Sequence, residues 1–310
     1  MSAPSSHLLP TGVAVFERGW LSSNNVLLDD GNTSTLIDTG YCTHAEQTLA
    51  LVAQALGERP LTHVLNTHLH SDHCGGNGAL QARYPGLVTA IPPGGSQAVA
   101  DWNEAALGHA RFGQSIVRFG FDRLLQPGST EHLAGRDWQV HAAPGHDPDA
   151  VLLFQLDTGV LISGDALWEN GFGVVFPELD GRSGFDDVAA TLDVIERLGP
   201  AVVIPGHGGV FADVPAAMAR ARTRLDGFVQ HPQRHLRHAA KVLVKYKLLE
   251  MGATTHANLH EWTLATPVLG DLHRISTGAP PQFNEWVDEL LADLVRAGAA
   301  KVDNGWVSNH

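Results

Sequence analysis

The chain has 310 residues, of which 44% are hydrophobic and 17% charged, as in a globular protein with one large domain or with a domain and an appendage. Its formal net charge of −13 argues against general affinity for nucleic acid. Two cysteines exclude a disulfide framework, and the lack of a signal peptide or a long apolar run predicts a cytoplasmic protein without membrane contact.

Short apolar runs bounded by turn signals predict a series of strands in the first two-thirds of the chain. We expect them at residues 13–16, 25–28, 35–40, 61–66, 87–91, 138–143, 151–156, 160–163 and 201–204. Helical spacing predicts a helix that ends near residue 56, others at 77–82 and 185–198, and irregular helical structure at 94–120. This alternation of strands and helices indicates an α/β fold.

A dense run of polar side chains follows the strand predicted at 61–66. His68, His70, Asp72 and His73 place three imidazoles and a carboxylate within six residues. Without a metal, one short turn would have little to satisfy so many strongly hydrated groups. Imidazole with carboxylate suits zinc, and also iron or manganese. A chance cluster is the alternative, and it is disfavoured because further ligand types recur later in the chain.

Three later strand ends carry the same kind of residue. His146 follows the strand at 138–143, Asp165 the strand at 160–163, and His207 the strand at 201–204. Loops beyond strand ends are where α/β folds place their sites. With the first run they give seven candidate ligands, which is too many for one tetrahedral zinc ion but suits two metals.

The seven candidates divide naturally between two metal positions. His68, His70 and His146 are expected on one metal, with Asp72, His73 and His207 on the other and Asp165 bridging both. A hydroxide held between two divalent metals is a nucleophile at neutral pH. We predict a second role for Asp72, which would orient this water and accept its proton.

These motifs resemble the metallo-β-lactamase superfamily. The resemblance rests on His68-x-His70-x-Asp72-His73, on His146, Asp165 and Pro205-Gly206-His207, and on the early Ile37-Asp38-Thr39-Gly40 turn, and it covers roughly residues 13–210. It implies an αβ/βα sandwich of two mixed sheets with the site along one edge, and the ligand division above agrees with it. It also implies that Asp38 supports the ligands from behind and is not catalytic.

Helical patterns dominate the last third of the chain. We predict helices at 239–251 and 281–297 and a short hairpin at 298–307. This pattern is similar to the winged-helix-like tail of the glyoxalase II-like and β-lactamase-like-protein-2-like members of the superfamily. We therefore predict a catalytic domain at residues 1–215 and a helical winged-helix-like domain at 216–310.

Residues 220–247, called the basic segment below, carry eight lysine or arginine residues against one aspartate. They could capture an anionic substrate portion such as glutathione, coenzyme A or nucleic acid, or they could pair with the acidic remainder of the protein. We predict that His231, His235 and His238 in this segment are surface or helix-packing residues and not metal ligands.

The sequence predicts a dinuclear metal hydrolase, with zinc favoured, that cleaves a thioester or related ester of a small anionic molecule. Trp168 and Phe172 follow Asp165 and are candidates for substrate contact, although both could simply pack against the sheet. The alternatives are a mononuclear-iron persulfide dioxygenase, an endoribonuclease, a lactonase or β-lactamase, and a non-catalytic binding module. The sequence leaves the oligomeric state open.

Overall fold

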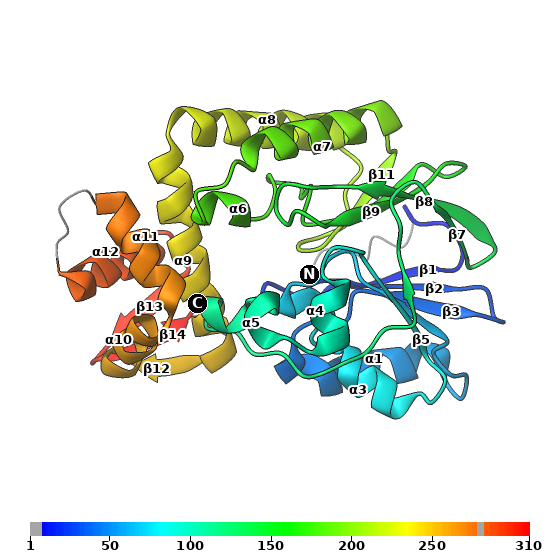
Figure 1. Ribbon diagram of the computed structural model, residues 1–310, viewed down its shortest axis with the longest axis horizontal. Helices are drawn as coiled ribbons and strands as arrows, with labels where there is room; N and C mark the ends of the chain where they lie inside the picture. Colours follow the sequence, from blue (N-terminus) through cyan, green and yellow to red (C-terminus); the bar gives the residue numbers. More distant parts are fainter. Residues whose placement is uncertain (1–7, 278–281) are drawn as a thin grey trace.

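Two mixed β-sheets pack face to face, with helices on their outer faces (Figure 1). The computed structural model describes residues 8–277 and 282–310. The first sheet has the order β1 Val13–Phe16, β2 Asn25–Asp29, β3 Ser34–Ile37, β4 His63–Leu65, β5 Val88–Ile91 and β6 Arg123–Leu124. The second has the order β11 Val202–Pro205, β10 Val160–Gly164, β9 Val151–Gln155, β8 Arg136–Ala142 and β7 Thr130–Leu133.

Each sheet combines antiparallel and parallel pairs. In the first sheet β1, β2 and β3 form an antiparallel meander, and β3 to β6 run parallel. In the second sheet only β10 and β11 are parallel. Parallel strands in one sheet have their C-terminal ends at the same edge of that sheet. The loops after β10 and β11 therefore lie at one edge of the second sheet, where they can meet the loop after β4 of the first sheet.

Alternation along the strands builds three apolar layers, because successive side chains point to opposite faces of a sheet. Ile37 and Leu65 point inward to the core between the sheets, together with Leu153 of the second sheet. Leu36 points outward, against the helices that cover the first sheet. Leu161 points outward against the helices that cover the second sheet.

Two pairs of helices cover the sandwich. Helices α1 Ala45–Leu56 and α3 Asn77–Arg83 pack on the first sheet, and α7 Phe185–Leu198 and α8 Val214–Gln230 pack on the second (Figure 1). The αβ/βα sandwich predicted from the sequence is therefore confirmed.

The last part of the chain, called the tail below, forms a separate apolar core at one end of the sandwich (Figure 1). Its elements are α9 Pro232–Met251, β12 Ala253–Thr255, α10 His256–Ala265, α11 Pro267–Thr277, α12 Phe283–Arg296, β13 Ala300–Asp303 and β14 Trp306–Asn309. The three strands form a small antiparallel sheet. Pro281, where we expected α12 to begin, lies outside the described residues. The division at residue 215 stays a prediction, and α8 shares the core of the second sheet.

Several short elements occupy the connections. They are η2 Cys42–His44, α2 Ser71–Cys74, α4 Ser96–Asp101, α5 Glu104–Leu107, η3 His109–Phe112 and α6 Phe176–Leu179. The strands β6 and β7 were not predicted. The strand expected at 35–40 ends at Ile37, because Asp38 adopts a positive φ of 57° and turns the chain. Within the described ranges, no helix combines the length and apolarity needed to cross a membrane.

Candidate metal centre

The seven predicted metal ligands meet at one edge of the sandwich. The first sheet contributes His68 and His70 from the loop after β4, and Asp72 and His73 from the short helix α2. The second sheet contributes single residues after β8, β10 and β11: His146, Asp165 and His207. Two halves of the chain that are separate in sequence therefore face each other across the site.

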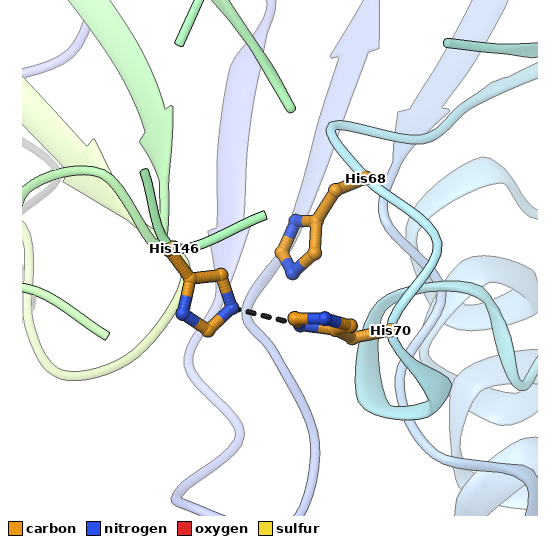
Figure 2. Close-up of side chains that lie close together, drawn as sticks. All are labelled: His68, His70 and His146. Atoms are coloured by element: carbon orange, nitrogen blue, oxygen red, sulfur yellow. Dashed lines mark hydrogen bonds between the residues drawn. The ribbon is translucent and has the colours of Figure 1, made fainter. Parts of the chain in front are cut away.

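His68, His70 and His146 form the first group, and one potential ligand atom from each lies within 4.8 Å of the others. Figure 2 shows the three rings converging, with His70 and His146 joined by a dashed line. His70 Nδ1 lies 2.8 Å from His146 Nε2. His70 therefore presents its Nδ1 to this group, while its Nε2 faces Asp147 Oδ2 at 3.5 Å.

Asp72, His73 and His207 form the second group, within the same 4.8 Å limit. His207 Nε2 lies 3.0 Å from Asp72 Oδ2, and His73 Nε2 lies 3.9 Å from that same oxygen. This group matches the second metal position predicted from the sequence.

Asp165 lies between the two groups. Its Oδ2 is 3.4 Å from His146 Nε2, and its Oδ1 is 3.4 Å from His73 Nε2. The Trp168 indole N–H donates to Oδ1 at 3.2 Å and helps to hold the carboxylate. Asp165 Oδ2 also lies 3.9 Å from His207 Nε2, so the carboxylate approaches residues of both groups, as a bridging ligand would.

Outward hydrogen bonds orient three of the histidines. The His146 Nδ1–H donates to the Val174 carbonyl at 2.6 Å, and the His73 Nδ1–H donates to Asp38 Oδ2 at 2.8 Å. His207 Nδ1 lies 3.2 Å from the Gly19 carbonyl. A ring that donates through Nδ1 keeps the lone pair of Nε2 for a metal, so these contacts select the metal-binding tautomer.

Asp38 lies behind the site, as the sequence predicted. Its carboxylate accepts hydrogen bonds from the Thr67 backbone N–H and hydroxyl, both at 2.8 Å, besides that of His73. Its side chain is buried, and it contacts His73 on the side away from the two groups. Asp38 therefore fixes the loop and one ring without facing the cavity.

Two buried ring nitrogens point to a group that the protein does not supply. His68 Nε2 and His73 Nε2 are buried and make no hydrogen bond. Leaving a buried polar atom unpaired costs about 1–3 kcal/mol. Both atoms face the other candidate ligands, and a divalent cation would satisfy them. The donor set of five imidazoles and two carboxylates fits zinc, iron or manganese.

Burial keeps three of the five rings neutral and therefore able to bind metal. Loss of hydration lowers the pKa of His70 and of His146 to about 4, and lowers the pKa of His68 well below 6.5. Burial alone would raise the pKa of Asp165, but the neighbouring imidazoles, His73 foremost, hold it well below its usual value. Burial also opposes a charge on His73 and His207, but the carboxylates beside them, Asp38 and Asp165 foremost, raise the pKa of these two rings above the usual value. The first group thus offers neutral nitrogen, and Asp165 offers anionic oxygen, which are the forms that bind metal.

Two glycines leave room for the predicted ligands. A Cβ at Gly206 would lie 2.2 Å from Asp165 Oδ1, and a Cβ at Gly173 would lie 2.2 Å from His146 Nδ1. Any side chain at either position would displace a ligand group. Close approach of the backbone explains why glycine precedes His207.

A cavity of about 690 Å³ opens over the two groups. Trp168 lines it, together with Trp20, Phe112, Phe176 and Tyr246, which the sequence analysis did not select. The Trp20 ring stacks on His207 at 5.4 Å between ring centroids. No local pattern around Trp20 or Tyr246 indicated this, since each reaches the site through the fold from a distant part of the chain.

Phe172 does not line the cavity, contrary to our expectation. Its side chain is 1% exposed and belongs to the core under the second sheet, where it contacts the Phe228 ring. The loop after Asp165 turns so that Trp168 faces the cavity and Phe172 faces inward. The alternative that we gave for Phe172, packing against the sheet, is what the structure has.

Four of the eight cations of the basic segment pair with acidic neighbours. Arg222 lies 2.8 Å from Asp193, and Arg237 and Lys241 both approach Asp293, at 2.9 and 3.6 Å. The segment therefore does not present a free basic face, and the alternative of internal pairing holds for these residues.

The three histidines of the basic segment are not among the metal groups. His231 is exposed, and the buried His235 accepts a hydrogen bond through Nε2 from the Val175 backbone N–H at 3.0 Å. His238 accepts one from Arg224 at 2.6 Å. His231 is thus a surface residue and His235 a helix-packing residue, as predicted, whereas His238 lines the cavity beside Arg224.

Two relatives have names that indicate thioester chemistry. The chain is 27% identical to the thioesterase pkgB of Emericella nidulans over 202 residues, 64% of this chain and 49% of that protein. It is 35% identical to a hydroxyacylglutathione hydrolase of Synechococcus over 152 residues, 48% of this chain and 51% of that protein. The chain thus spans about half the length of these two relatives.

A solved structure and a family model extend the comparison. The protein TTHA1623, crystallised in a di-iron-bound form, is 26% identical, with a TM-score of 0.52 over 67% of this chain and 96% of that one. The family model described as the metallo-beta-lactamase superfamily matches residues 18–207, which include every predicted ligand. The chain belongs to the metallo-β-lactamase superfamily.

Proposed function

We propose that this protein is a dinuclear metal-dependent hydrolase that cleaves a thioester or related ester of a small anionic substrate. The observation that carries the proposal is the pair of three-residue groups that face each other with Asp165 between them. Membership of a hydrolase-rich superfamily and the di-iron form of a structural relative support two metals. Zinc is our first choice of metal, with iron or manganese as alternatives.

The roles of the protein's own residues follow from their positions. Divalent metals bound here supply Lewis acidity, which activates water and polarises a carbonyl group. Asp72, whose Oδ2 lies 3.0 Å from His207 Nε2 in the second group, would orient the attacking water and take its proton. Trp20 and Trp168 form an aromatic wall of the cavity beside His207, which an apolar part of the substrate would contact.

The names of the relatives favour a thioester as the scissile bond. One is called a thioesterase and the other a hydroxyacylglutathione hydrolase. Both resemble this chain over about half of their own length.

The position of Arg224 favours an anionic substrate. Of the cations in the basic segment it is the one that lines the cavity, and it has no carboxylate partner in the part of the chain described. Its guanidinium lies over the Phe172 and Phe228 rings and donates to His238. Burial lowers the pKa of Arg224, so its charge is held at an energetic cost that a bound anion would offset.

A substrate panel tests this proposal. Protein with bound metal should hydrolyse acyl-glutathione or acyl-coenzyme A thioesters faster than lactones, β-lactams and phosphodiesters, and prolonged treatment with a chelator should abolish the activity. Oxygen consumption with a persulfide, or cleavage of RNA, would contradict it. RNA cleavage has little support here, because Lys241 approaches Asp293 and the Lys245 ammonium is bound by Ala299 and Asn309. A cytoplasmic location stays a prediction of the sequence.

A further inference from the structure

A third group of metal-competent side chains lies in the tail, away from the metal centre. Within residues 8–277 and 282–310, His256, His260 and Asp288 are the group outside the metal centre whose potential ligand atoms lie within 4.8 Å of one another. His256 and His260 are four residues apart on α10, so they project from the same side of that helix. Asp288 comes from the next but one helix, α12.

The three side chains converge on one point. His256 Nε2 lies 2.9 Å from Asp288 Oδ1, and His260 Nε2 lies 2.7 Å from that same oxygen. The two rings are 4.5 Å apart between centroids. Two imidazole nitrogens and a carboxylate oxygen are therefore already gathered in the arrangement that a helix-borne histidine pair offers to zinc.

The exposure of this group suits a site that exchanges metal with solvent. The side chains of His256 and Asp288 are 41% and 48% exposed, and that of His260 is 14% exposed. Three protein ligands leave at least one coordination position for water, and solvent can reach it directly. Imidazole pairs favour Zn²⁺, Ni²⁺ or Cu²⁺ over Mg²⁺ or Ca²⁺, which prefer all-oxygen sites.

A metal here would connect two helices of the tail. Leu259 of α10 and Leu290 and Leu291 of α12 belong to the same apolar core, so the neighbours of the ligands are already packed together. A metal bond between α10 and α12 would stabilise the folded tail, because the unfolded chain does not hold the three ligands together.

We propose that His256, His260 and Asp288 form a separate binding site for a late transition-metal ion such as Zn²⁺ or Ni²⁺, which clamps α10 to α12. This site is independent of the reaction at the metal centre. It would bind more weakly than that centre, since it has fewer ligands and is open to solvent.

Titration of the full chain with its catalytic metals already bound tests the site. Calorimetry with added Zn²⁺, and separately Ni²⁺, should show one further ion per chain. The double variant His256→Ala/His260→Ala should lose this ion, or bind it at least tenfold more weakly, and keep its thioesterase turnover. Asp288→Asn, which preserves shape, should weaken binding in the same direction. The matched control is His132→Ala, which removes an exposed histidine paired with a single aspartate, Asp137.

Each outcome bears on the proposal. Loss of the extra ion in the double variant but not in His132→Ala supports it. No extra ion in the wild-type protein, or an extra ion bound equally by the double variant, overturns it. A zinc-dependent rise in melting temperature that disappears in Asp288→Asn would identify the clamp itself.

Discussion

At the scale of single residues, three histidines of the centre (His73, His146 and His207) are oriented by a partner on the side away from the metal groups. His73 shows this most clearly, since Asp38 takes its Nδ1–H and leaves its buried Nε2 without a hydrogen bond. The same carboxylate accepts a hydrogen bond from the backbone N–H of Thr67, the residue before the histidine run. One aspartate thus controls both the tautomer of a ring and the path of the loop that carries the other ligands.

Asp72 should be more than a ligand. Asp72→Asn removes the negative charge and the capacity to accept a proton, so we expect turnover to fall by about 10²–10⁴-fold. Steady-state kinetics with a thioester, accompanied by metal analysis, measures this. The exposed Asp101→Asn provides a control. Near wild-type turnover of Asp72→Asn with full metal content would refute the role in proton transfer.

Arg224 should act on binding and not on the chemical step. Replacing it by Gln removes one charge-assisted contact, worth about 1.5–3 kcal/mol, so KM for an anionic thioester should rise about tenfold to a hundredfold at similar kcat. Arg222→Gln is the control, because Arg222 lies two residues earlier on α8, pairs with Asp193 and does not line the cavity. An unchanged KM in Arg224→Gln would show that the substrate anion is held elsewhere.

At the scale of elements, the predicted strands and the positions of the ligands after them could be found from the sequence. Each ligand follows a strand whose apolar run is readable, as with Val202–Pro205 before His207. The two-residue strand β6 and the exposed strand β7 offered no such run. The direction of Phe172 could not be found either, since both Trp168 and Phe172 are aromatic and only the fold decides which one is buried.

Gly206, in the loop after β11, should be needed for metal binding, because a side chain at this position would collide with Asp165. Gly206→Ala would push a methyl group against Asp165, so we expect loss of bound metal and at least a tenfold fall in kcat/KM. Gly209→Ala is the matched control in the same loop, because its Cβ would meet only an ordinary contact 3.6 Å away. Equal metal content and activity in both variants would contradict the assignment of Asp165.

The stability that α9 gains from the contact of His235 with the sandwich should decrease in acid. His235 accepts a hydrogen bond from Val175, and burial lowers its pKa to about 4, so the folded state resists protonation. The unfolded chain, with an ordinary pKa near 6.5, binds the proton first as the pH falls. Stability from this residue is therefore complete above about pH 6.5 and declines toward pH 4, by at most about 3 kcal/mol.

Urea unfolding across this pH range measures the effect. His235→Gln keeps an acceptor but cannot titrate, so its free energy of unfolding should fall less between pH 7 and pH 4.5 than that of the wild type. A wild-type curve parallel to that of the variant would show that His235 does not contribute.

At the scale of the whole molecule, the centre joins the two halves of the sandwich. His68 and its neighbours come from the first sheet, while His146, Asp165 and His207 come from the second. The family and the seven side chains that converge at the centre could be predicted from the sequence, because ligand types at strand ends are local patterns. Pairing of the basic segment with acidic residues was one of the sequence's two interpretations, but its partners Asp193 and Asp293 could not be named, because ion pairs between distant helices leave no local pattern.

The number of tightly bound metal ions tests the central claim most directly. The His256→Ala/His260→Ala variant, dialysed against metal-free buffer, excludes the tail site from the count. Elemental analysis of this protein should find two divalent ions per chain, and the same sample should hydrolyse a thioester. A single iron per chain, with oxygen consumed in the presence of a persulfide and no thioester hydrolysis, would contradict the dinuclear hydrolase.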